Sequence, residues 1–236
     1  MEFKSFSSKG NVRQNNEDNY LVRKEPCPVI VVADGMGGHK AGDVASQMAV
    51  DLIKEYDFDL NEDILKELEK LINIINDKII KKGEDNIKYK GMGTTLSLAL
   101  IYNHKIYIGH IGDSRIYLFR NDKLKKITND DSLVNELIKN GRLKPSEAFD
   151  HPKKHILTQA LGTDKNIQIE TNKIDLENND LLLFCTDGLT DMIREEKIEE
   201  IISGHIKLDT ITKKLGKKAL ENGGSDNITL VTGIIN

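Results

Sequence analysis

Hydrophobic residues follow two spacings along this chain, one typical of strands and the other of helices. Short apolar runs rich in β-branched side chains, bounded by Gly, Asn, Asp or Ser, predict strands. Apolar side chains that recur every three or four positions predict amphipathic helices. The predicted strands are residues 3–8, 19–23, 29–33, 94–102, 105–109, 115–119, 123–127, 167–174, 181–185 and 228–235. The predicted helices are residues 45–56, 64–79, 132–138, 198–202 and 211–220.

The order of these segments favours an α+β layered domain. The predicted strands between residues 94 and 127 follow one another across short polar breaks, as in an antiparallel meander. The helices come in pairs and do not alternate strictly with strands, which argues against a parallel doubly wound sheet. Asn61 is the expected N-cap of the helix at 64–79, and Ser132 can cap the next one. Because there is no repeat and no linker-like stretch, we expect residues 1–236 to form one domain.

The composition narrows the classes of protein that fit. Hydrophobic residues make up 38% of the 236 residues and charged residues 31%, a balance typical of a globular chain with ample core. The net charge is -4 and the cations are scattered, so no nucleic-acid partner is expected. No apolar run reaches the roughly 18 residues of a membrane helix, and we expect a cytoplasmic protein without a membrane partner. Cys27 and Cys185 should therefore stay reduced, and a disulfide framework is excluded.

The candidate chemistry begins at the end of the strand 29–33. This strand runs directly into Asp34 and Gly35, and two more glycines and His39 follow within four residues. Glycine permits close backbone approach, so the Asp34 carboxylate and the Gly35 carbonyl could face one ligand. The alternative is an ordinary Asp-Gly turn after a buried strand.

Other acidic residues also stand at the ends of predicted strands. Asp113, Asp187 and Asp226 lie next to strand ends, and Glu17 and Asp18 precede the strand 19–23. Any one of them alone is more simply explained as a turn residue. Carboxylates that converge repel one another and need a counter-charge. The set therefore predicts hard divalent cations in oxygen coordination, more than one of them, and no Cys/His set indicates a structural zinc.

Six short segments in this order resemble the bacterial metal-dependent protein serine/threonine phosphatases of the protein phosphatase 2C type (PP2C, PPM family). The resemblance runs from about residue 5 to the C-terminus. The segments are Gly10-Asn11-Val12-Arg13 with Asn16-Glu17-Asp18, Asp34-Gly35-Met36-Gly37-Gly38-His39, Gly91-Met92-Gly93-Thr94-Thr95-Leu96, Gly112-Asp113-Ser114-Arg115, Thr186-Asp187-Gly188-Leu189 and Asp226-Asn227-Ile228-Thr229.

The resemblance implies a four-layer αββα sandwich of two antiparallel sheets, with helix pairs outside and a metal site at one edge. It implies two Mn²⁺ or Mg²⁺ ions bridged by Asp34, with the Gly35 carbonyl on one and Asp187 and Asp226 on the other. Glu17 and Asp18 would lie close by, largely through water. A weaker third ion would be held by Asp113 and Asp187, with Asp191 as a further candidate.

A two-metal site activates a water for in-line attack on a phosphoserine or phosphothreonine. Arg13 is the candidate to bind the phosphoryl oxygens, because its planar fork matches them; the alternative is a solvated charge. His39 is the candidate acid for the leaving oxygen, or else it orients metal-bound water. The remaining histidines are expected to be structural or surface residues: His104, His110, His151, His155 and His205.

The departures from the family pattern fall in residues 128–162, which the family uses as a mobile flap. Asp131 stands where many members carry His, and His155 stands where Asn is commoner. Lys153 and Lys154 either contact substrate or form a solvated face. These departures leave the metal and phosphate residues unchanged, so they bear on substrate choice.

The resemblance also implies phosphoprotein substrates and a cognate Ser/Thr kinase, and we expect a monomer. A cysteine-based phosphatase is excluded, because no Arg stands six positions after Cys27 or Cys185. The rival that stays open is a regulatory module that binds metal without catalysis.

Overall fold

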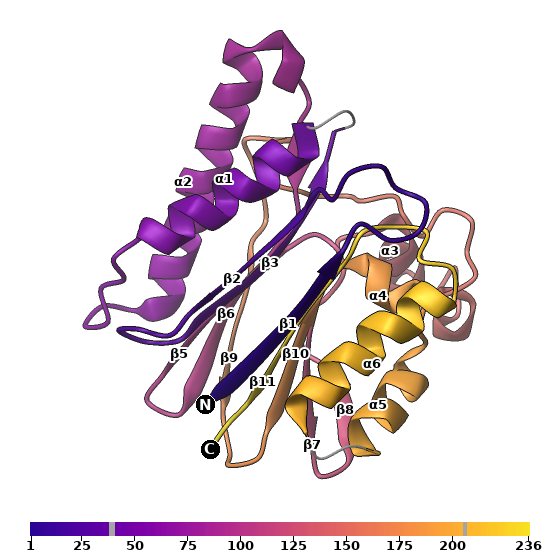
Figure 1. Cartoon of the computed structure of the whole chain (residues 1–236). Helices are drawn as coiled ribbons and strands as arrows, with labels where there is room; N and C mark the ends of the chain where they lie inside the picture. The colour runs from indigo at the N-terminus through magenta and orange to yellow at the C-terminus, as the bar shows by residue number, and fades with distance from the viewer. Residues whose placement is uncertain (38–40, 205–206) are drawn as a thin grey trace.

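Two antiparallel sheets form the centre of the molecule in the computed structural model, which describes residues 1–37, 41–204 and 207–236 (Figure 1). One sheet has the strand order β1-β11-β10-β7-β8, and the other has the order β2-β3-β5-β6-β9 with β4 paired to β3. The strands are β1 (Glu2–Ser8), β2 (Asp18–Arg23), β3 (Val29–Met36), β4 (Gly93–Thr94), β5 (Leu96–Tyr102), β6 (Lys105–Ile111), β7 (Arg115–Arg120), β8 (Lys123–Lys126), β9 (Glu170–Asp175), β10 (Leu181–Cys185) and β11 (Ile228–Ile234).

Helix pairs cover the outer face of each sheet, as Figure 1 shows. Helices α1 (Ala41–Glu55) and α2 (Ile64–Asp85) pack on the sheet that contains β3 and β6. Helices α5 (Glu195–Ser203) and α6 (Leu208–Glu221) cover the sheet that contains β10 and β11. The four-layer αββα sandwich implied by the resemblance is therefore confirmed. None of the described helices is both long enough and apolar enough to cross a lipid bilayer.

The first five residues of β3 form an unbroken apolar run because both faces of the strand are covered there. Val29, Val31 and Ala33 pack beneath the helices, whereas Ile30 and Val32 face the second sheet. All five are fully buried. A strand buried on both faces shows a continuous apolar run instead of alternation. This rigid strand ends in the residues that were singled out from the sequence.

The predicted meander is wrong at residues 112–114. Strand β6 ends at Ile111 in one sheet, and β7 begins at Arg115 in the other. Gly112 makes this crossing possible with a φ of 106°, and a Cβ there would lie 2.6 Å from Thr95 Cγ2. Its backbone N–H donates to Asp131 Oδ2 at 3.0 Å, and Asp113 is thereby held at a passage between the sheets.

Side chains cap α2 and α3 at their N-termini. Asp63, not Asn61, caps α2, because its Oδ1 accepts a hydrogen bond from the backbone of Leu65 at 3.1 Å. Ser132 caps α3 (Leu133–Lys139) as predicted. Helix α4 (Asp187–Thr190) was not predicted, because four residues are too few to show a helical period.

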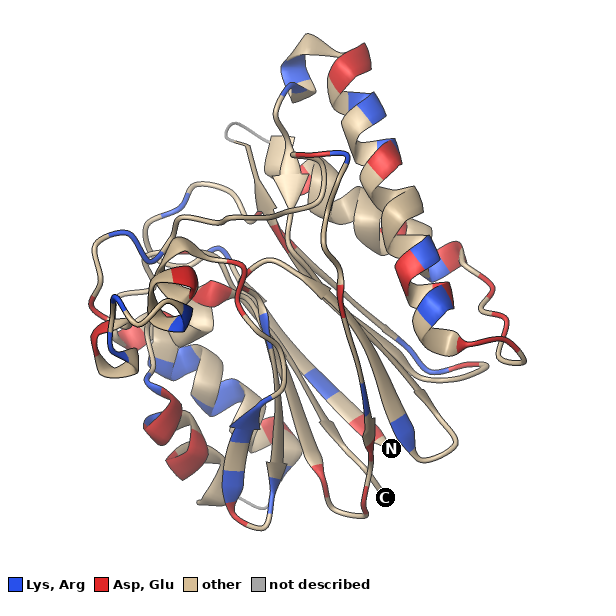
Figure 2. Cartoon of the chain, turned by 180° about the vertical axis from the view of Figure 1, so that it is seen from behind, with Lys and Arg blue, Asp and Glu red and all other residues tan. Residues whose placement is uncertain are grey.

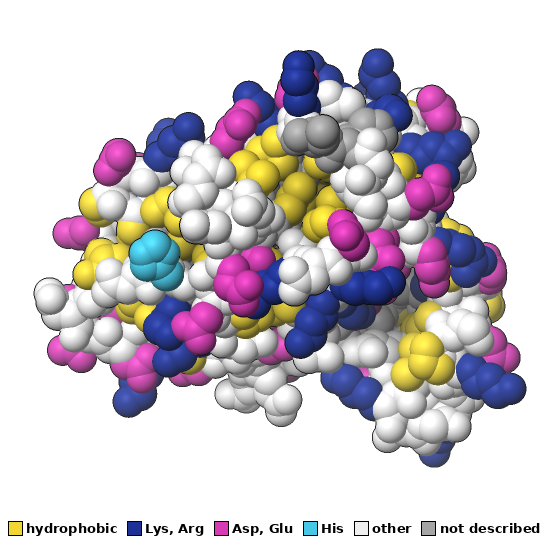
Figure 3. Space-filling view, turned by 90° about the horizontal axis from the view of Figure 1, so that it is seen from below, with side chains coloured by type: hydrophobic (Ala, Val, Ile, Leu, Met, Phe, Trp, Pro, Cys, Tyr) yellow, Lys and Arg dark blue, Asp and Glu magenta, His cyan; other side chains and the backbone are white. Residues whose placement is uncertain are grey.

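Charges of both signs are interspersed at the lower end of the sandwich, where a strip of apolar side chains is also visible (Figure 3). Basic and acidic residues likewise mingle on the outer helices, and acidic residues mark the upper ends of several central strands (Figure 2).

Candidate metal centre

The pairing of the strands brings the distant acidic residues to one edge of the sandwich. Asp18 and Asp34 are direct partners in the β2–β3 ladder. Strands β10 and β11 are antiparallel neighbours, so Asp187 after β10 and Asp226 before β11 lie at the same edge. Asp113 reaches this edge through the passage between the sheets.

A cavity of about 500 Å³ opens where these segments meet. Seven of the predicted site residues line it: Arg13, Glu17, Asp34, Gly35, Asp113, Asp187 and Asp226. Asp18 is 5% exposed and lies behind the lining, where Thr186 Oγ1 donates to its Oδ2 at 2.8 Å. His39, like His205, lies outside the residues that the structure describes.

Backbone hydrogen bonds fix the end of β3. The N–H of Asp34 donates to Thr95 Oγ1 at 2.9 Å, and its carbonyl accepts from Thr94 Oγ1 and from the Thr95 N–H, both at 2.9 Å. Thr95 Oγ1 also contacts Ser114 Oγ at 2.7 Å. Thr94 and Thr95 therefore support the site through hydrogen bonds, and the Asp34 carboxylate is left to the cavity.

Gly35 and Gly42 allow β3, β2 and α1 to approach one another closely. A Cβ on Gly35 would lie 2.2 Å from the Gly42 carbonyl oxygen. A Cβ on Gly42 would lie 2.4 Å from Glu17 Oε2 and 2.6 Å from the Gly35 carbonyl oxygen. A carboxylate oxygen and a carbonyl oxygen therefore lie beside the same point, and both are ligands that hard divalent cations prefer.

Another close approach positions Asp187. A Cβ on Gly188 would lie only 1.8 Å from the carbonyl oxygen of Asn227. The first turn of α4 can therefore rest on the start of β11 only with glycine at this position. This contact keeps Asp187 and Asp226 on neighbouring segments.

The concentrated carboxylates perturb one another. Burial, followed by the charges of its acidic neighbours, raises the pKa of Asp34 well above its usual range. Burial raises the pKa of Asp18 to about 8 and that of Asp187 to about 6, and it raises the pKa of Asp113 strongly. The group can be fully ionised at neutral pH only when a positive charge compensates it.

Two buried oxygens have no hydrogen-bond partner among the described residues, Asp18 Oδ1 and Asp187 Oδ1. A buried acceptor without a partner is costly and rare. Orphaned oxygens, raised pKa values and an all-oxygen donor set together fit hard divalent cations better than any other group.

Arg13 extends over the same cavity. Its Nη2 donates to Asp226 Oδ2 at 2.7 Å, while 57% of its side chain stays exposed. Partial burial would lower its pKa, but the bond to Asp226 and the charges of Asp187 and Asp34 outweigh this and raise it.

Asn227 is a site residue that the sequence reasoning missed. Its Nδ2 donates to the carbonyls of Lys9 and Asn15, and its Oδ1 accepts from the Glu17 N–H at 2.8 Å. It thus ties the loop that carries Arg13 to the start of β11. The signal for it in the sequence was its place beside Asp226 in one of the six segments that resemble the family.

Comparison with known proteins decides the family. The family model described as protein phosphatase 2C matches residues 7–221. The chain belongs to the protein phosphatase 2C family. It is therefore a metal-dependent protein serine/threonine phosphatase that acts on phosphoproteins.

Curated relatives and solved structures of similar proteins agree with this assignment. The chain is 43% identical to the protein phosphatase PhpP of Streptococcus pneumoniae over 98% of this chain and 96% of that protein. It is 40% identical to the serine/threonine phosphatase stp of Listeria innocua over 95% of this chain and 92% of that protein. The crystal structure of the Mycobacterium tuberculosis phosphatase PstP/Ppp matches with a TM-score of 0.93 and 34% identity, over 100% of this chain and 98% of that one. A structure of the PstP catalytic domain in complex with two manganese ions matches with a TM-score of 0.88, 32% identity and the same coverage.

The segment expected to form the flap lies against the cavity, which His155 and Leu157 help to line. Lys154 Nζ lies 3.2 Å from Asp191 Oδ1 and 5.1 Å from the centroid of the Phe149 ring, with 20% of its side chain exposed. A solvated face is therefore the wrong interpretation for Lys154, although Lys153 is exposed. His155 lines the cavity and contacts Asp191, so its assignment to the surface was incomplete. His110 is fully buried between Ser97 and the Gly112 carbonyl, a structural role as predicted.

Proposed function

We propose that this phosphatase holds two divalent cations, Mn²⁺ or Mg²⁺, with Asp34 as the shared ligand. The Gly35 carbonyl would bind one ion, and Asp187 and Asp226 the other. Glu17 and Asp18 would lie close to the ions and act on them largely through metal-bound water. The observation that carries this proposal is the convergence of desolvated carboxylates in and directly behind a cavity that also contains Arg13. Two of these carboxylates have an oxygen without a hydrogen-bond partner among the described residues. The two manganese ions in the structure of the similar PstP catalytic domain support the number.

A bound cation pair would supply the Lewis acidity that activates water and offsets charge on a phosphoryl group. Arg13 would bind the equatorial phosphoryl oxygens. Its guanidinium already lines the cavity, and one edge contacts Asp226 while most of the side chain remains accessible. A planar fork can engage a phosphate with two parallel hydrogen bonds, which a lysine cannot do.

His39 would protonate the leaving serine or threonine oxygen, or orient water that does so. This assignment rests on its place in the sequence two residues after Gly37, which lines the cavity. Asp113 would contribute, with Asp187, to a third and weaker ion site. Its burial beside Asp187 and its raised pKa support this assignment.

The cognate partner would be a bacterial Ser/Thr protein kinase whose phosphorylated products this phosphatase dephosphorylates. We further propose a cytoplasmic monomer, organised as one domain over residues 1–236 with a flap at 128–162. The contacts of Lys154 and His155 with Asp191 beside the cavity support the assignment of residues 128–162 as a flap.

The decisive experiment compares the native chain with Asp34→Ala in hydrolysis of a phosphothreonine peptide at increasing Mn²⁺. We expect metal-dependent turnover in the native chain and its loss by at least about 10³-fold in the variant, because the shared ligand is gone. Asp175→Asn is the matched control, since Asp175 is exposed and pairs with Lys105 far from the cavity. A folded native chain that binds Mn²⁺ without turning over the peptide would instead support the regulatory module.

A further inference from the structure

A second cavity, of about 550 Å³, adjoins the metal centre on the side of the flap. Asp113 and Asp187 line both cavities, so the second one opens next to the place where a phosphoryl group would bind. We call it the flap cavity, because one of its walls comes from α3 and residues 145–149. That wall is apolar and consists of Val134, Ile138, Pro145, Ala148 and Phe149. The flap therefore presents an apolar surface beside a polar metal centre.

Contacts between the flap and the start of α5 fix this wall. Arg194, the N-cap of α5, forms an ion pair with Asp150 at 2.7 Å. Its Cζ also lies 4.0 Å from the centroid of the Phe149 ring, and Lys154 Nζ lies 5.1 Å from the same centroid. Cations over an aromatic ring are attracted to its face. The Phe149 ring is thus held in place by side chains of the chain itself.

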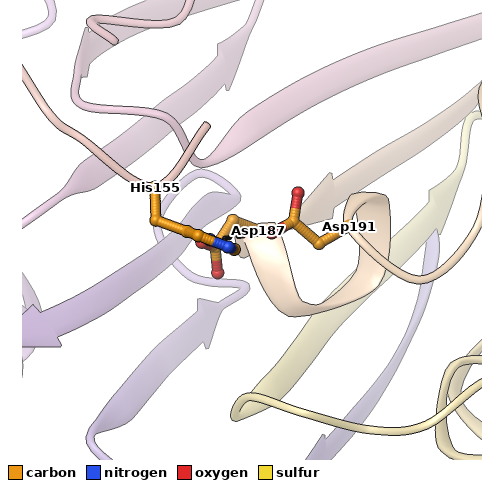
Figure 4. A group of neighbouring side chains, drawn as sticks. All are labelled: His155, Asp187 and Asp191. Carbon is orange, nitrogen blue, oxygen red and sulfur yellow. Dashed lines mark ion pairs between the residues drawn. The ribbon is translucent and has the colours of Figure 1, made fainter. Parts of the chain in front are cut away.

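His155 and Asp191 mark the boundary between the two cavities. His155 lines the metal cavity, Asp191 lines the flap cavity, and His155 Nδ1 lies 3.0 Å from Asp191 Oδ2. Figure 4 shows the imidazole approaching Asp187 and Asp191 from a separate segment of chain. Successive Cα atoms of a peptide are about 3.8 Å apart. A phosphoprotein segment bound at the metal centre can therefore reach across this boundary within a few residues.

The chemistry of the flap cavity favours an uncharged occupant. Apart from the two aspartates shared with the metal centre, its least exposed charges are paired with one another. Arg115 donates to both carboxylate oxygens of Asp130, and Lys126 Nζ lies 3.1 Å from Asp130 Oδ1. Tyr117 Oη donates to Glu195 Oε1 at 2.9 Å. A charged ligand would have to compete with these pairs, which is costly where water is excluded. An apolar group gains free energy by burial against the flap wall.

We propose that the flap cavity receives a large apolar side chain, aliphatic or aromatic, from a substrate residue within about three positions of the phosphothreonine or phosphoserine. The volume of about 550 Å³ falls in the range of roughly 300–1,000 Å³ that is typical of cavities enclosing a ligand. The preferred substrates are then phosphoproteins with an apolar residue close to the phosphorylated one. This inference rests on the proposed function in one respect, that the phosphoryl group lies in the metal cavity.

Matched phosphothreonine peptides test the preference. Each position within about three residues of the phosphothreonine carries Leu, Gly or Lys in turn, in an otherwise identical polar sequence. At one position we expect kcat/KM to be at least about tenfold higher with Leu than with Gly, mostly through KM, because an apolar pocket discriminates by this much for small differences in buried side chain. Equal rates for the three residues at every position overturn the proposal. A preference for Lys also overturns it, and would show that Glu195 and Glu196 attract a cation.

Variants of the flap locate the source of the preference. The readout is the ratio of kcat/KM for the Leu peptide to that for the Gly peptide, because incomplete folding or metal loading affects both peptides equally. Ile138→Glu puts a charge into the apolar wall, so the ratio should fall to about one and Lys should become the better residue. Ile156→Glu is the matched control, since Ile156 lies in the same flap, is 46% exposed and lines neither cavity. A native ratio in Ile138→Glu, or an equal loss in Ile156→Glu, contradicts the proposal.

Photo-crosslinking places the substrate side chain directly. The probe is the preferred peptide with a photoactivatable leucine at the selected position and a non-hydrolysable phosphonate in place of the phosphate. We expect the label on residues of the flap wall, such as Ile138 and Ala148. Val12 is the rival location, because it is 69% exposed and directly precedes Arg13 in the chain. Labelling of Val12 in place of the flap wall overturns the proposal.

These readouts separate the inference from the proposed function. If the native chain hydrolyses all the peptides at similar rates, only the role of the flap cavity fails. If no peptide is hydrolysed while the label appears on the flap wall, the subsite stands and the catalytic proposal fails.

Discussion

Asp18 should destabilise the metal-free fold, and replacing it by Asn should reveal by how much. Asp18 is 5% exposed, one of its oxygens has no hydrogen-bond partner among the described residues, and burial raises its pKa from 3.8 to about 8. At pH 7 the unfolded chain ionises this carboxyl, whereas the folded chain holds it protonated. Each pH unit between 3.8 and 7 contributes about 1.4 kcal/mol, so the carboxyl costs about 4 kcal/mol of stability.

The sign of this effect fixes its pH window. A carboxyl whose folded pKa is raised binds its proton more tightly in the folded state, so stability falls as the pH rises from about 4 to about 8. Below pH 4 both states are protonated and the cost vanishes. Asn keeps an oxygen for the hydroxyl of Thr186, but its amide must find a partner, which offsets up to about 2 kcal/mol. The net gain expected for Asp18→Asn at pH 7 is therefore about 2–4 kcal/mol.

Thermal unfolding after chelation measures this gain. For a chain of this length it corresponds to a rise in Tm of roughly 5–15 °C at pH 7 and almost none at pH 3. In saturating Mn²⁺ the advantage should disappear, because the compensating charge then stabilises the native carboxylate. Asp175→Asn, at an exposed carboxyl, is the control. A metal-free Asp18→Asn chain that is less stable than the native one at pH 7, or equally improved at pH 3, would refute the reasoning.

Two further changes test other parts of the site. Gly188→Ala should lower the free energy of unfolding measured in urea by at least about 2 kcal/mol, because its Cβ would meet the Asn227 carbonyl oxygen at 1.8 Å. Gly204→Ala is the control and should lower it far less, because its Cβ would meet only the Glu200 carbonyl oxygen at 3.2 Å. Arg13→Lys keeps the charge but loses the planar fork, so kcat/KM for a phosphothreonine peptide should fall roughly 10–100-fold, with the exposed Arg142→Lys as control. Native-like stability of the first variant, or native-like kinetics of the second, would show that the contact in question is dispensable.

The positions of Asp34 and Gly35 were predictable because their local context is unusual. An unbroken apolar strand that runs into a glycine turn occurs where backbone and carboxylate must both approach a ligand. Asp187 and Asp226 shared the same context, and seven of the nine predicted residues line one cavity.

Features that depend on distant partners were not predictable. The polar break around Asp113 looks the same whether it forms a hairpin or a passage between sheets, and only the pairing of β7 with β10 decides. The contacts of Lys154 and His155 with Asp191 join segments that are far apart in sequence, so no local pattern could reveal them. Asn227 was missed for the same reason, since its partners lie more than two hundred residues away.

The place of β11 between β1 and β10 has a consequence for synthesis of the chain. It pairs with Glu2–Ser8 on one side and with Leu181–Cys185 on the other, and Asp226 and Asn227 stand at its start. On the ribosome, β11 emerges after every other described strand. The first strand and the loop that carries Arg13 therefore wait until a strand more than two hundred residues later in the chain has been synthesised. The nascent chain cannot assemble a complete metal centre until that last strand is available, so hydrolytic activity should begin only after it has left the exit tunnel.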